Sequence, residues 1–396
     1  MRDVVIIDGV RTAIGTFGGS LRTVHPGDLG AAVIREALRR SQVDPAQVED
    51  VVMGCVGQWG ESAYIARICA IKAGIPETAN AFTVNRLCSS GLQAIISAAQ
   101  AIRAGDIDIA VAGGVENMSQ LPFFIRKARW GEMRMGHERL EDGLITALSD
   151  PFGNGIMGET AEAVAEKYGI SRAEQDAFAA ESQRRAARAI EAGEFEAEIV
   201  PIEVPDPKRR GETIPFARDE HPRPGTTVEQ LARLKPVFRP NGTVTAGNSS
   251  GINDGAAAVV MMGADVAERL GLKPKLRLVA SAMAGIDPKY MGYAPTFAIP
   301  KVLQRAQLRL DDIDVIELNE AFAAQAVAVI RDAGLDPERT NPNGGAIALG
   351  HPVGATACIL TVKAMYYLER HGGRYAMVTM CVGGGQGLAA IFERVA

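Results

Sequence analysis

Two patterns of hydrophobic and polar positions alternate along the chain. Short, mostly apolar runs at residues 4–7, 81–84, 107–112 and 375–381 are typical of buried strands. Between such runs lie stretches with apolar residues at helical spacing, of which the Ala-rich segment 92–102 is the clearest. Strands that alternate with helices in this way favour an α/β fold.

The chain contains two copies of one plan. Residues 37–52 and 302–316 each indicate a helix, a short loop and a buried strand, and they match at a constant offset of 265 positions. Further on, each copy has a Gly-rich loop before an apolar helix, at residues 88–91 and 351–355, and then a strand. Three matches in the same order predict a duplicated α/β unit.

A different kind of sequence separates the two copies. Residues 120–250 are more charged and less regular, and Ser171 to Glu174 is a capping-box pattern for a helix that we expect to end at Gly193. Basic clusters at 126–129 and 208–210 are either solvated faces or contacts for a phosphate-bearing substrate. An insertion of this kind covers a site, makes an interface or is a solvated appendage.

The composition excludes several classes of protein. The 396 residues include 47% hydrophobic and 22% charged residues, as in ordinary globular proteins. The net charge of −5 gives no support for binding to nucleic acid. No apolar run approaches the ~18–20 residues that cross a bilayer, so we expect no membrane partner. The N-terminus resembles neither a secretory signal nor a transit peptide.

The cysteines are few, odd in number and without a CxxC pair. They are Cys55, Cys69, Cys88, Cys358 and Cys381. This pattern argues against a disulfide scaffold and against a zinc ribbon, so we expect no metal site. It favours a reducing cytoplasm as the location of the protein.

Cys88 is the first candidate for chemistry. It lies where the β-favouring stretch 81–84 gives way to the helical pattern of residues 92–102. A helix N-terminus presents unpaired N–H groups and a positive dipole end, and both favour thiolate over thiol. This placement suggests a nucleophile, although a lone cysteine in such a chain is more often an inert packing residue.

His351 is the second candidate. It lies in the Gly-rich loop 343–355, and Pro352 follows it at a helix start. The duplicated plan places His351 at about the same point in its copy as Cys88 in the other. Pseudo-symmetric halves would bring the two side chains together as a Cys–His pair, with His351 stabilising the Cys88 thiolate.

Two further segments carry polar or reactive groups at strand ends. Cys381 ends a buried strand and begins the Gly-rich run 381–387, whose N–H groups are suited to binding an oxyanion. Asn319 follows the predicted strand 314–316, and by itself such a residue is more often a helix cap.

Taken together, these motifs resemble those of the thiolase family, and most closely its acetoacetyl-CoA thiolases. The motifs are Asn85–Gly91 around Cys88, Asn319–Phe322, Gly350–Pro352 and Cys381–Gly385. The resemblance covers essentially the whole chain. It implies an α/β fold of duplicated halves, a five-layer α-β-α-β-α sandwich with mixed sheets, and an inserted loop domain that binds CoA.

On this resemblance we expect three units. Residues 1–119 together with 251–273 form the N-terminal half, residues 120–250 form the inserted domain with CoA and oligomer contacts, and residues 274–396 form the C-terminal half. Members of the family are dimers or tetramers, and we expect a homotetramer.

The resemblance also assigns catalytic roles. Cys88 takes the acyl group as a thioester, His351 activates it, and Cys381 removes a proton from the α-carbon of the second acetyl-CoA. His351 and a water held by Asn319 supply one oxyanion hole, and the N–H groups of Cys88 and Gly383 supply the other.

The activity implied is that of an acetyl-CoA C-acetyltransferase, which reversibly condenses two acetyl-CoA to acetoacetyl-CoA and CoA. CoA is then a substrate and product, and we expect no separate cofactor. The alternative within the family is a 3-oxoacyl-CoA thiolase of broader chain length, or one that acts on 3-oxoadipyl-CoA.

The match to the family's CoA contacts is less even. Arg223, Phe238 and Ser250 fall where the family contacts CoA, and Met157 and Met291 fall where it lines the acyl pocket. Two residues depart from biosynthetic relatives, since Ile156 replaces a His and Gln230 replaces a Ser. These departures put the details of CoA contact in doubt, but not the chemistry.

Three other enzyme classes fit less well. Residues 247–251 match the GxSxG hydrolase elbow, but the flanking strand and helix are both unclear. A ketosynthase would carry a His or an Asn at the position of Cys381. A dehydrogenase would need a dinucleotide fingerprint, and the chain has none.

Overall fold

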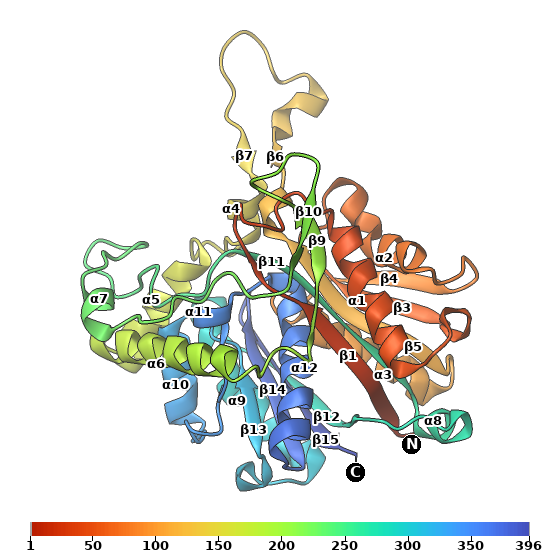
Figure 1. The fold of residues 1–396 in the computed structure, drawn as a ribbon. Helices are drawn as coiled ribbons and strands as arrows, with labels where there is room; N and C mark the ends of the chain where they lie inside the picture. The colour runs from red at the N-terminus through yellow and green to blue at the C-terminus, as the bar shows by residue number, and fades with distance from the viewer. Residues whose placement is uncertain (1, 396) are drawn as a thin grey trace.

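The computed structural model describes residues 2–395 as an α/β fold around one mixed sheet of eleven strands (Figure 1). The strands of the N-terminal half are β1 (Val4–Thr12), β2 (Gly15–Thr16), β3 (Asp50–Gly54), β4 (Asn80–Val84), β5 (Ile109–Asn117) and β11 (Asn253–Gly263). Those of the C-terminal half are β12 (Leu276–Gly285), β13 (Val315–Leu318), β14 (Tyr375–Val382) and β15 (Gln386–Arg394). The main path runs β13-β14-β15-β12-β1-β11-β5-β3-β4, while β2 pairs with β11, and β8 (Ile199–Val200) pairs with β1.

The helices form three layers around the two halves of this sheet. They are α1 (Pro26–Ser41), α2 (Ile65–Ala73), α3 (Ser90–Ala104), α8 (Ala264–Leu270), α9 (Pro295–Ala306), α10 (Ala323–Asp332), α11 (Ala346–Leu349) and α12 (Val353–His371). The helices α3 and α12 lie in the central core between the two sheet halves, α1 and α2 cover the outer face of one half, and α9 and α10 cover that of the other. This arrangement confirms the predicted five-layer sandwich of duplicated halves.

The duplication is visible in the bounds of the elements. The helix α1 ends at Ser41 and α9 at Ala306, which preserves the offset of 265 found in the sequence. The residue after each helix, Gln42 and Gln307, is a glutamine with φ of 56°. A 3-10 turn and then a buried strand follow in both halves, at the same offset.

The two half-sheets join edge to edge. The strands β1 and β12 pair antiparallel over a short stretch, with Val5 opposite Arg277 and Ile6 opposite Leu276. The predicted mixed sheets are therefore hydrogen-bonded into a single sheet, in which β3–β4, β3–β5 and β13–β14 are the parallel pairs of the main path.

The region between the halves covers one end of the sandwich. It holds β6 (Phe123–Phe124), β7 (Glu141–Asp142), α4 (Gly143–Ala147), α5 (Met157–Tyr168), α6 (Arg172–Glu191), β8, β9 (Ile202–Pro205), β10 (Thr213–Phe216) and α7 (Val228–Ala232). The segment between β6 and β7 protrudes at the top of Figure 1. The capping box of Ser171 and Glu174 opens α6 as predicted, and the helix ends two residues before Gly193.

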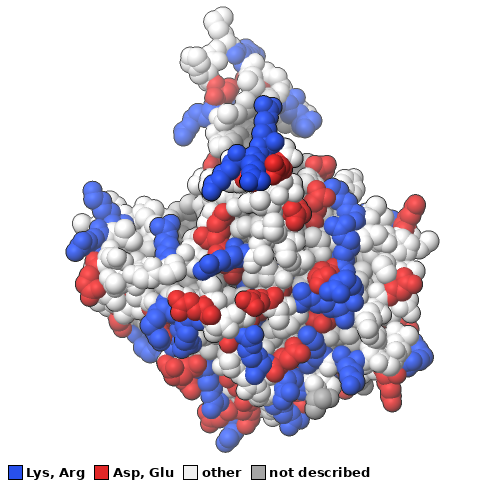
Figure 2. Space-filling model, viewed as in Figure 1, with Lys and Arg blue, Asp and Glu red and all other residues white. Residues whose placement is uncertain are grey.

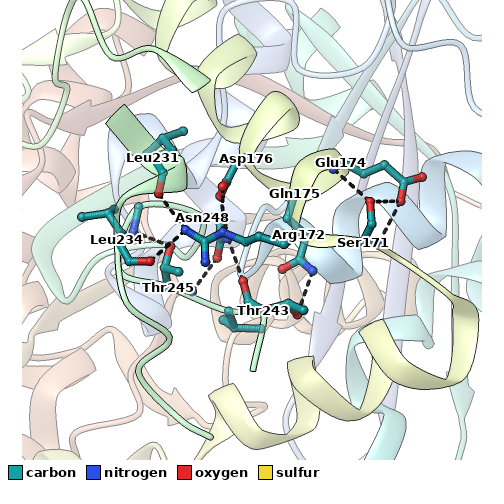
Figure 3. A network of polar contacts seen from close by, with 12 residues as sticks. Ser171, Arg172, Glu174, Gln175, Asp176, Leu231, Leu234, Thr243, Thr245 and Asn248 are labelled. Carbon is teal, nitrogen blue, oxygen red and sulfur yellow. Dashed lines mark hydrogen bonds and ion pairs between the residues drawn. The ribbon is translucent and has the colours of Figure 1, made fainter. Parts of the chain in front are cut away.

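A polar network attaches α6 to α7 and to the loop that follows it (Figure 3). Arg172 donates from Nη2 to the carbonyl of Leu231 at 2.7 Å. Asp176 accepts from Arg172 Nε at 2.7 Å and from Asn248 Nδ2 at 3.0 Å. Asn248 belongs to the GxSxG segment, which forms a turn here with neither a strand before it nor a helix after it. The hydrolase interpretation therefore has no structural support.

Acidic and basic side chains are interspersed over the face drawn in Figure 2. Members of both basic clusters pair with carboxylates at the surface, as Arg126 does with Glu141 and Arg209 with Glu212. Both clusters are exposed to solvent. Within residues 2–395, no helix has the length and apolar character needed to cross a membrane.

Candidate active site

Cys88 lies in a tight turn between β4 and α3. The N–H groups of Ser89 and Ser90 donate to the carbonyls of Arg86 and Leu87, and Ser89 is the N-cap of α3. Leu87 has φ of 47°, which is unusual for a bulky residue and is typical of strained backbone at functional sites. The predicted position of Cys88 at a strand-to-helix junction is confirmed.

The environment of Cys88 stabilises the thiol. The residue is half-buried and packs against the central core, and burial raises the pKa of its thiol to about 11, against the opposing effect of N–H groups from Gly383 and Cys88 itself. The local N–H groups favour the thiolate, as expected, but burial has the larger effect on the pKa. Loss of hydration outweighs the local N–H groups.

His351 is buried, and its contacts fix its tautomer. The Thr356 hydroxyl donates to the carbonyl of Pro352 at 2.9 Å, so its oxygen accepts from His351 Nδ1 at 2.6 Å. The proton is thus on Nδ1, and Nε2 keeps its lone pair. Burial lowers the pKa of His351 to about 4, so the ring is neutral at neutral pH and Nε2 can accept a proton.

The two loops meet because the two central helices pack at their N-terminal turns. Cys88 precedes the first residue of α3 by two positions, and His351 precedes the first residue of α12 by two. Gly91 permits the close approach of the helices, since an added Cβ there would lie 2.7 Å from the backbone nitrogen of Cys358. The equivalent placement predicted from the duplication is confirmed.

Cys381 lies near the end of β14 and is completely buried. Burial raises the pKa of its thiol well above the ordinary value, and the charge of a Cys88 thiolate adds to this effect. The following turn brings Gly383 against the Cys88 loop, because an added Cβ at Gly383 would lie 3.0 Å from Leu87 Cδ1. The two thiols and the Gly383 N–H therefore share one site.

Asn319 adjoins the imidazole. Its Nδ2 lies 3.4 Å from His351 Nε2, and its backbone N–H donates to Thr379. The Oδ1 atom is buried and has no hydrogen-bond partner among the described residues. A water or a substrate group is the natural partner for such an atom.

The five residues expected to bind CoA or the acyl group do not all lie in one place. Phe238 and Met291 pack with Met157 in the apolar cluster that contains Cys381. Ser250 donates its N–H to the carbonyl of Ala321 at 3.0 Å, beside this cluster. Arg223 is exposed on a loop, and its backbone N–H donates to the side chain of Gln183.

A cavity of about 500 Å³ opens at Cys88. Met157 and Gly383 line it, together with several apolar side chains and the carboxylate of Glu116. Glu116 is 1% exposed and accepts backbone N–H groups from Val56, Gly57 and Gly354, each at 2.9 Å. It therefore holds the first turn of α12, which follows His351, against the N-terminal half.

Sequence reasoning missed Glu116 and Thr356. Thr356 carries a weak signal, because its spacing from His351 places it in the first turn of the following helix. Glu116 is near the end of β5. In the first half, β5 occupies the place that β14 occupies in the second half. The duplicated plan therefore pointed to this position as the partner of Cys381.

Comparison with known families agrees with this geometry. A model of the thiolase N-terminal domain matches residues 4–265, and a model of the thiolase C-terminal domain matches residues 272–394. The chain belongs to the thiolase family. As a thiolase it is an acyltransferase, which agrees with a site built around a nucleophilic thiol.

Curated relatives match this thiolase over its full length. It is 56% identical over 396 residues to the beta-ketothiolase BktB of Cupriavidus necator. It is 50% identical over 395 residues to an acetyl-CoA acetyltransferase of Pseudomonas aeruginosa, and 48% identical over 405 residues to a beta-ketoadipyl-CoA thiolase of Acinetobacter baylyi. In all three cases 100% of both chains is covered.

Solved structures confirm the fold of this thiolase. The acetyl-CoA acetyltransferase of Bacillus anthracis superimposes with a TM-score of 0.97 at 45% identity, and human mitochondrial 3-ketoacyl-CoA thiolase with a TM-score of 0.96 at 42% identity. Each match covers 100% of this chain and 99% of the other. The names of these thiolases state different acyl substrates.

Proposed function

We propose that this thiolase condenses two molecules of acetyl-CoA to acetoacetyl-CoA and CoA, and catalyses the reverse thiolysis, through an acyl thioester on Cys88. The observation that carries the proposal is the proximity of two thiols, Cys88 and Cys381, beside the N-terminal turn of α3, which packs against the helix that follows the neutral His351. One thiol serves as the nucleophile and the other as the base for a carbon-bound proton. Simple acyl transfer needs only the first of these groups.

The first half-reaction acylates Cys88. Its thiol proton moves to His351 Nε2 as the sulfur attacks the thioester carbonyl, because Nδ1 is already protonated and hydrogen-bonded to Thr356. The N–H groups of Cys88 and Gly383 stabilise the oxyanion. The CoA thiolate leaves and takes the proton of the Cys381 thiol, so that Cys381 becomes a thiolate while His351 keeps the proton of Cys88.

The second half-reaction forms the carbon–carbon bond. Cys381 accepts a proton from the α-carbon of the second acetyl-CoA, and Asn319 orients a water toward the enolate oxygen. The enolate carbon attacks the thioester on Cys88, and acetoacetyl-CoA forms as the carbon–sulfur bond breaks. The released Cys88 sulfur takes up the proton held by His351, and Cys381 keeps the proton from carbon, so both thiols and the neutral imidazole are restored.

Radiolabelled acetyl-CoA tests the two roles separately. We expect no covalent label on a Cys88→Ala enzyme. A Cys381→Ala enzyme should become labelled but should form no acetoacetyl-CoA. Cys69→Ala, in the outer layer at α2, is the matched control and should behave as the wild type. Label trapped on the Cys88→Ala enzyme would overturn the proposal.

The cavity at Cys88 supports a second candidate, a 3-oxoacyl-CoA thiolase of broader chain length. About 500 Å³ is far more than an acetyl group occupies, given that one water takes about 30 Å³ of liquid volume. A thiolysis series of 3-oxoacyl-CoA of increasing length separates the candidates. Activity confined to acetoacetyl-CoA supports the first alone, and a flat profile supports the second in addition to the first.

We also propose that the enzyme is a cytoplasmic homotetramer. All five cysteines are free thiols, which fits a reducing compartment. The protruding segment between β6 and β7 exposes Trp130, Met135 and Leu140, and exposed apolar groups of this kind favour contact with a second copy. Light scattering should give four times the molar mass of one chain, and loss of the tetramer in Trp130→Ser would support this contact.

A further inference from the structure

The lining of the cavity at Cys88 is apolar over most of its surface. It includes Leu87, Met118, Leu121, Leu148, Phe152 and Met157. An acyl group bound to Cys88 extends into the space that opens from this residue. A hydrocarbon chain is stabilised there by the burial of its surface, at about 25 cal/mol per Å².

The ionisable groups in the lining of the cavity are all acids. Among the described residues, no Lys or Arg lines the cavity, and its ionisable side chains are Cys88 and Glu116. Burial raises the pKa of Glu116, against the opposing effect of three backbone N–H donors and the thiol of Cys55. Glu116 already uses these donors, so the cavity offers a carboxylate on the substrate no cationic partner.

Arg86 is the cation closest in sequence to the nucleophile, but it does not line the cavity. Its Nη1 donates to Gln386 Oε1 at 3.3 Å, and it is Gln386 that forms part of the lining. The Nε atom of Arg86 is buried without a partner among the described residues. Arg86 would thus have to leave Gln386 before it reached a carboxylate in the cavity.

We propose that this cavity accepts, besides acetyl, longer acyl groups with uncharged, apolar chains and rejects those that end in a carboxylate. The inference rests on the proposed thiolase reaction and names the substrate class of the same site. The apolar lining accommodates the chain, and the absence of a cation beside Glu116 leaves a terminal carboxylate desolvated and unpaired, which is strongly unfavourable. A relative that is named for beta-ketoadipyl-CoA does not therefore predict the substrate of this chain.

Two substrates of equal length test the proposal directly. The acyl groups of 3-oxohexanoyl-CoA and 3-oxoadipyl-CoA both have six carbons and differ only in a terminal methyl or carboxylate. At neutral pH we expect kcat/KM for thiolysis of 3-oxohexanoyl-CoA to be within about 10-fold of that for acetoacetyl-CoA. For 3-oxoadipyl-CoA we expect a value about 100-fold lower or less.

A charge introduced into the lining should reverse the discrimination. Leu148→Arg places a cation in the cavity, and we expect it to raise the ratio of 3-oxoadipyl to 3-oxohexanoyl thiolysis by about 10-fold or more. Leu148→Met is the uncharged control and should leave this ratio unchanged. Because the ratio compares two substrates on one enzyme, it is independent of the fraction of enzyme that folds.

The outcomes separate the two levels of inference. If the wild type does not cleave acetoacetyl-CoA, the proposed function fails. If it cleaves acetoacetyl-CoA but cleaves 3-oxoadipyl-CoA as well as 3-oxohexanoyl-CoA, only the charge selection fails. Loss of that 3-oxoadipyl activity in Arg86→Gln would then assign Arg86 as the carboxylate receptor and overturn the proposal. A fall of more than about 100-fold from acetoacetyl-CoA to 3-oxohexanoyl-CoA would overturn the acceptance of longer chains.

Discussion

His351 and Thr356 are joined by a hydrogen bond of 2.6 Å between Nδ1 and Oγ1. Because the Thr356 hydroxyl gives its proton to the carbonyl of Pro352, it receives the proton of the imidazole. The bond leaves Nε2 with its lone pair on the side of Asn319. One turn of α12 thus selects the tautomer that can deprotonate Cys88.

Thr356→Val removes this acceptor and should lower kcat/KM for thiolysis by about 10- to 100-fold, because both tautomers of His351 then become populated. Thr356→Ser keeps the hydroxyl and should retain most of the activity. Steady-state assays with acetoacetyl-CoA and CoA measure the effect.

Thr361 provides a matched control for this experiment. It is also buried in α12, and its hydroxyl donates to the carbonyl of Ala357 at 2.9 Å, as that of Thr356 does to Pro352. Thr361→Val should therefore leave kcat/KM close to the wild-type value. An equal loss in the two valine variants would show that Thr356 acts through helix stability alone.

The pKa of Cys88 predicts the pH dependence of its alkylation. A thiol with a pKa raised to about 11 is protonated at neutral pH. As long as the pH is below 11, each increase of one pH unit raises its thiolate fraction about tenfold. The rate constant for iodoacetamide at Cys88, followed by mass spectrometry of its peptide, should still increase between pH 8 and pH 10, both values chosen about one to three units below 11. A plateau beginning near neutral pH would instead indicate a resting ion pair with His351.

Much of this fold could be predicted from the sequence because the same plan occurs twice along the chain. The offset of 265 that relates Leu38 to Leu303 also relates the ends of α1 and α9, so local pattern and architecture agree. The placement of Cys88 and His351 before helices followed from the same repeat. These features depend on residues that are close together in the sequence.

Other features depend on contacts that no local pattern encodes. The pairing of β1 with β12 joins Val5 to Arg277 and Ile6 to Leu276, far apart in the sequence, and nothing in either strand marks its partner. The helix terminus beside Cys88 is visible in the sequence, whereas the burial that outweighs its effect on the pKa comes from distant segments. The contacts of Glu116 were not predictable for the same reason, since its three N–H donors come from the loop after β3 and from the first turn of α12.

Gly383→Ala tests the N–H donor that faces Cys88. The new Cβ would lie 3.0 Å from Leu87 Cδ1 and 3.4 Å from Met157 Sδ, so the turn must shift by a few tenths of an ångström. We expect kcat to fall by about 100-fold while the protein stays folded, since loss of one oxyanion donor has this size. Gly285→Ala is the control, because an added Cβ there would meet only the carbonyl of Gly385, at 3.9 Å. Unchanged kcat in Gly383→Ala would contradict the assigned role.

Lys363 and Glu317 form a buried ion pair between α12 and β13, with 2.8 Å between Nζ and Oε2. Lys363 also donates to the carbonyl of Gly344, in the loop that leads to His351, at 2.8 Å. Lys363→Met leaves Glu317 as an unpaired buried charge and should destabilise the protein by about 3–5 kcal/mol in urea unfolding. Adding Glu317→Gln to Lys363→Met removes that charge and should recover a large part of the loss. If the double variant is no more stable than Lys363→Met, the loss arises from the bond to Gly344 and from packing, and not from the stranded carboxylate.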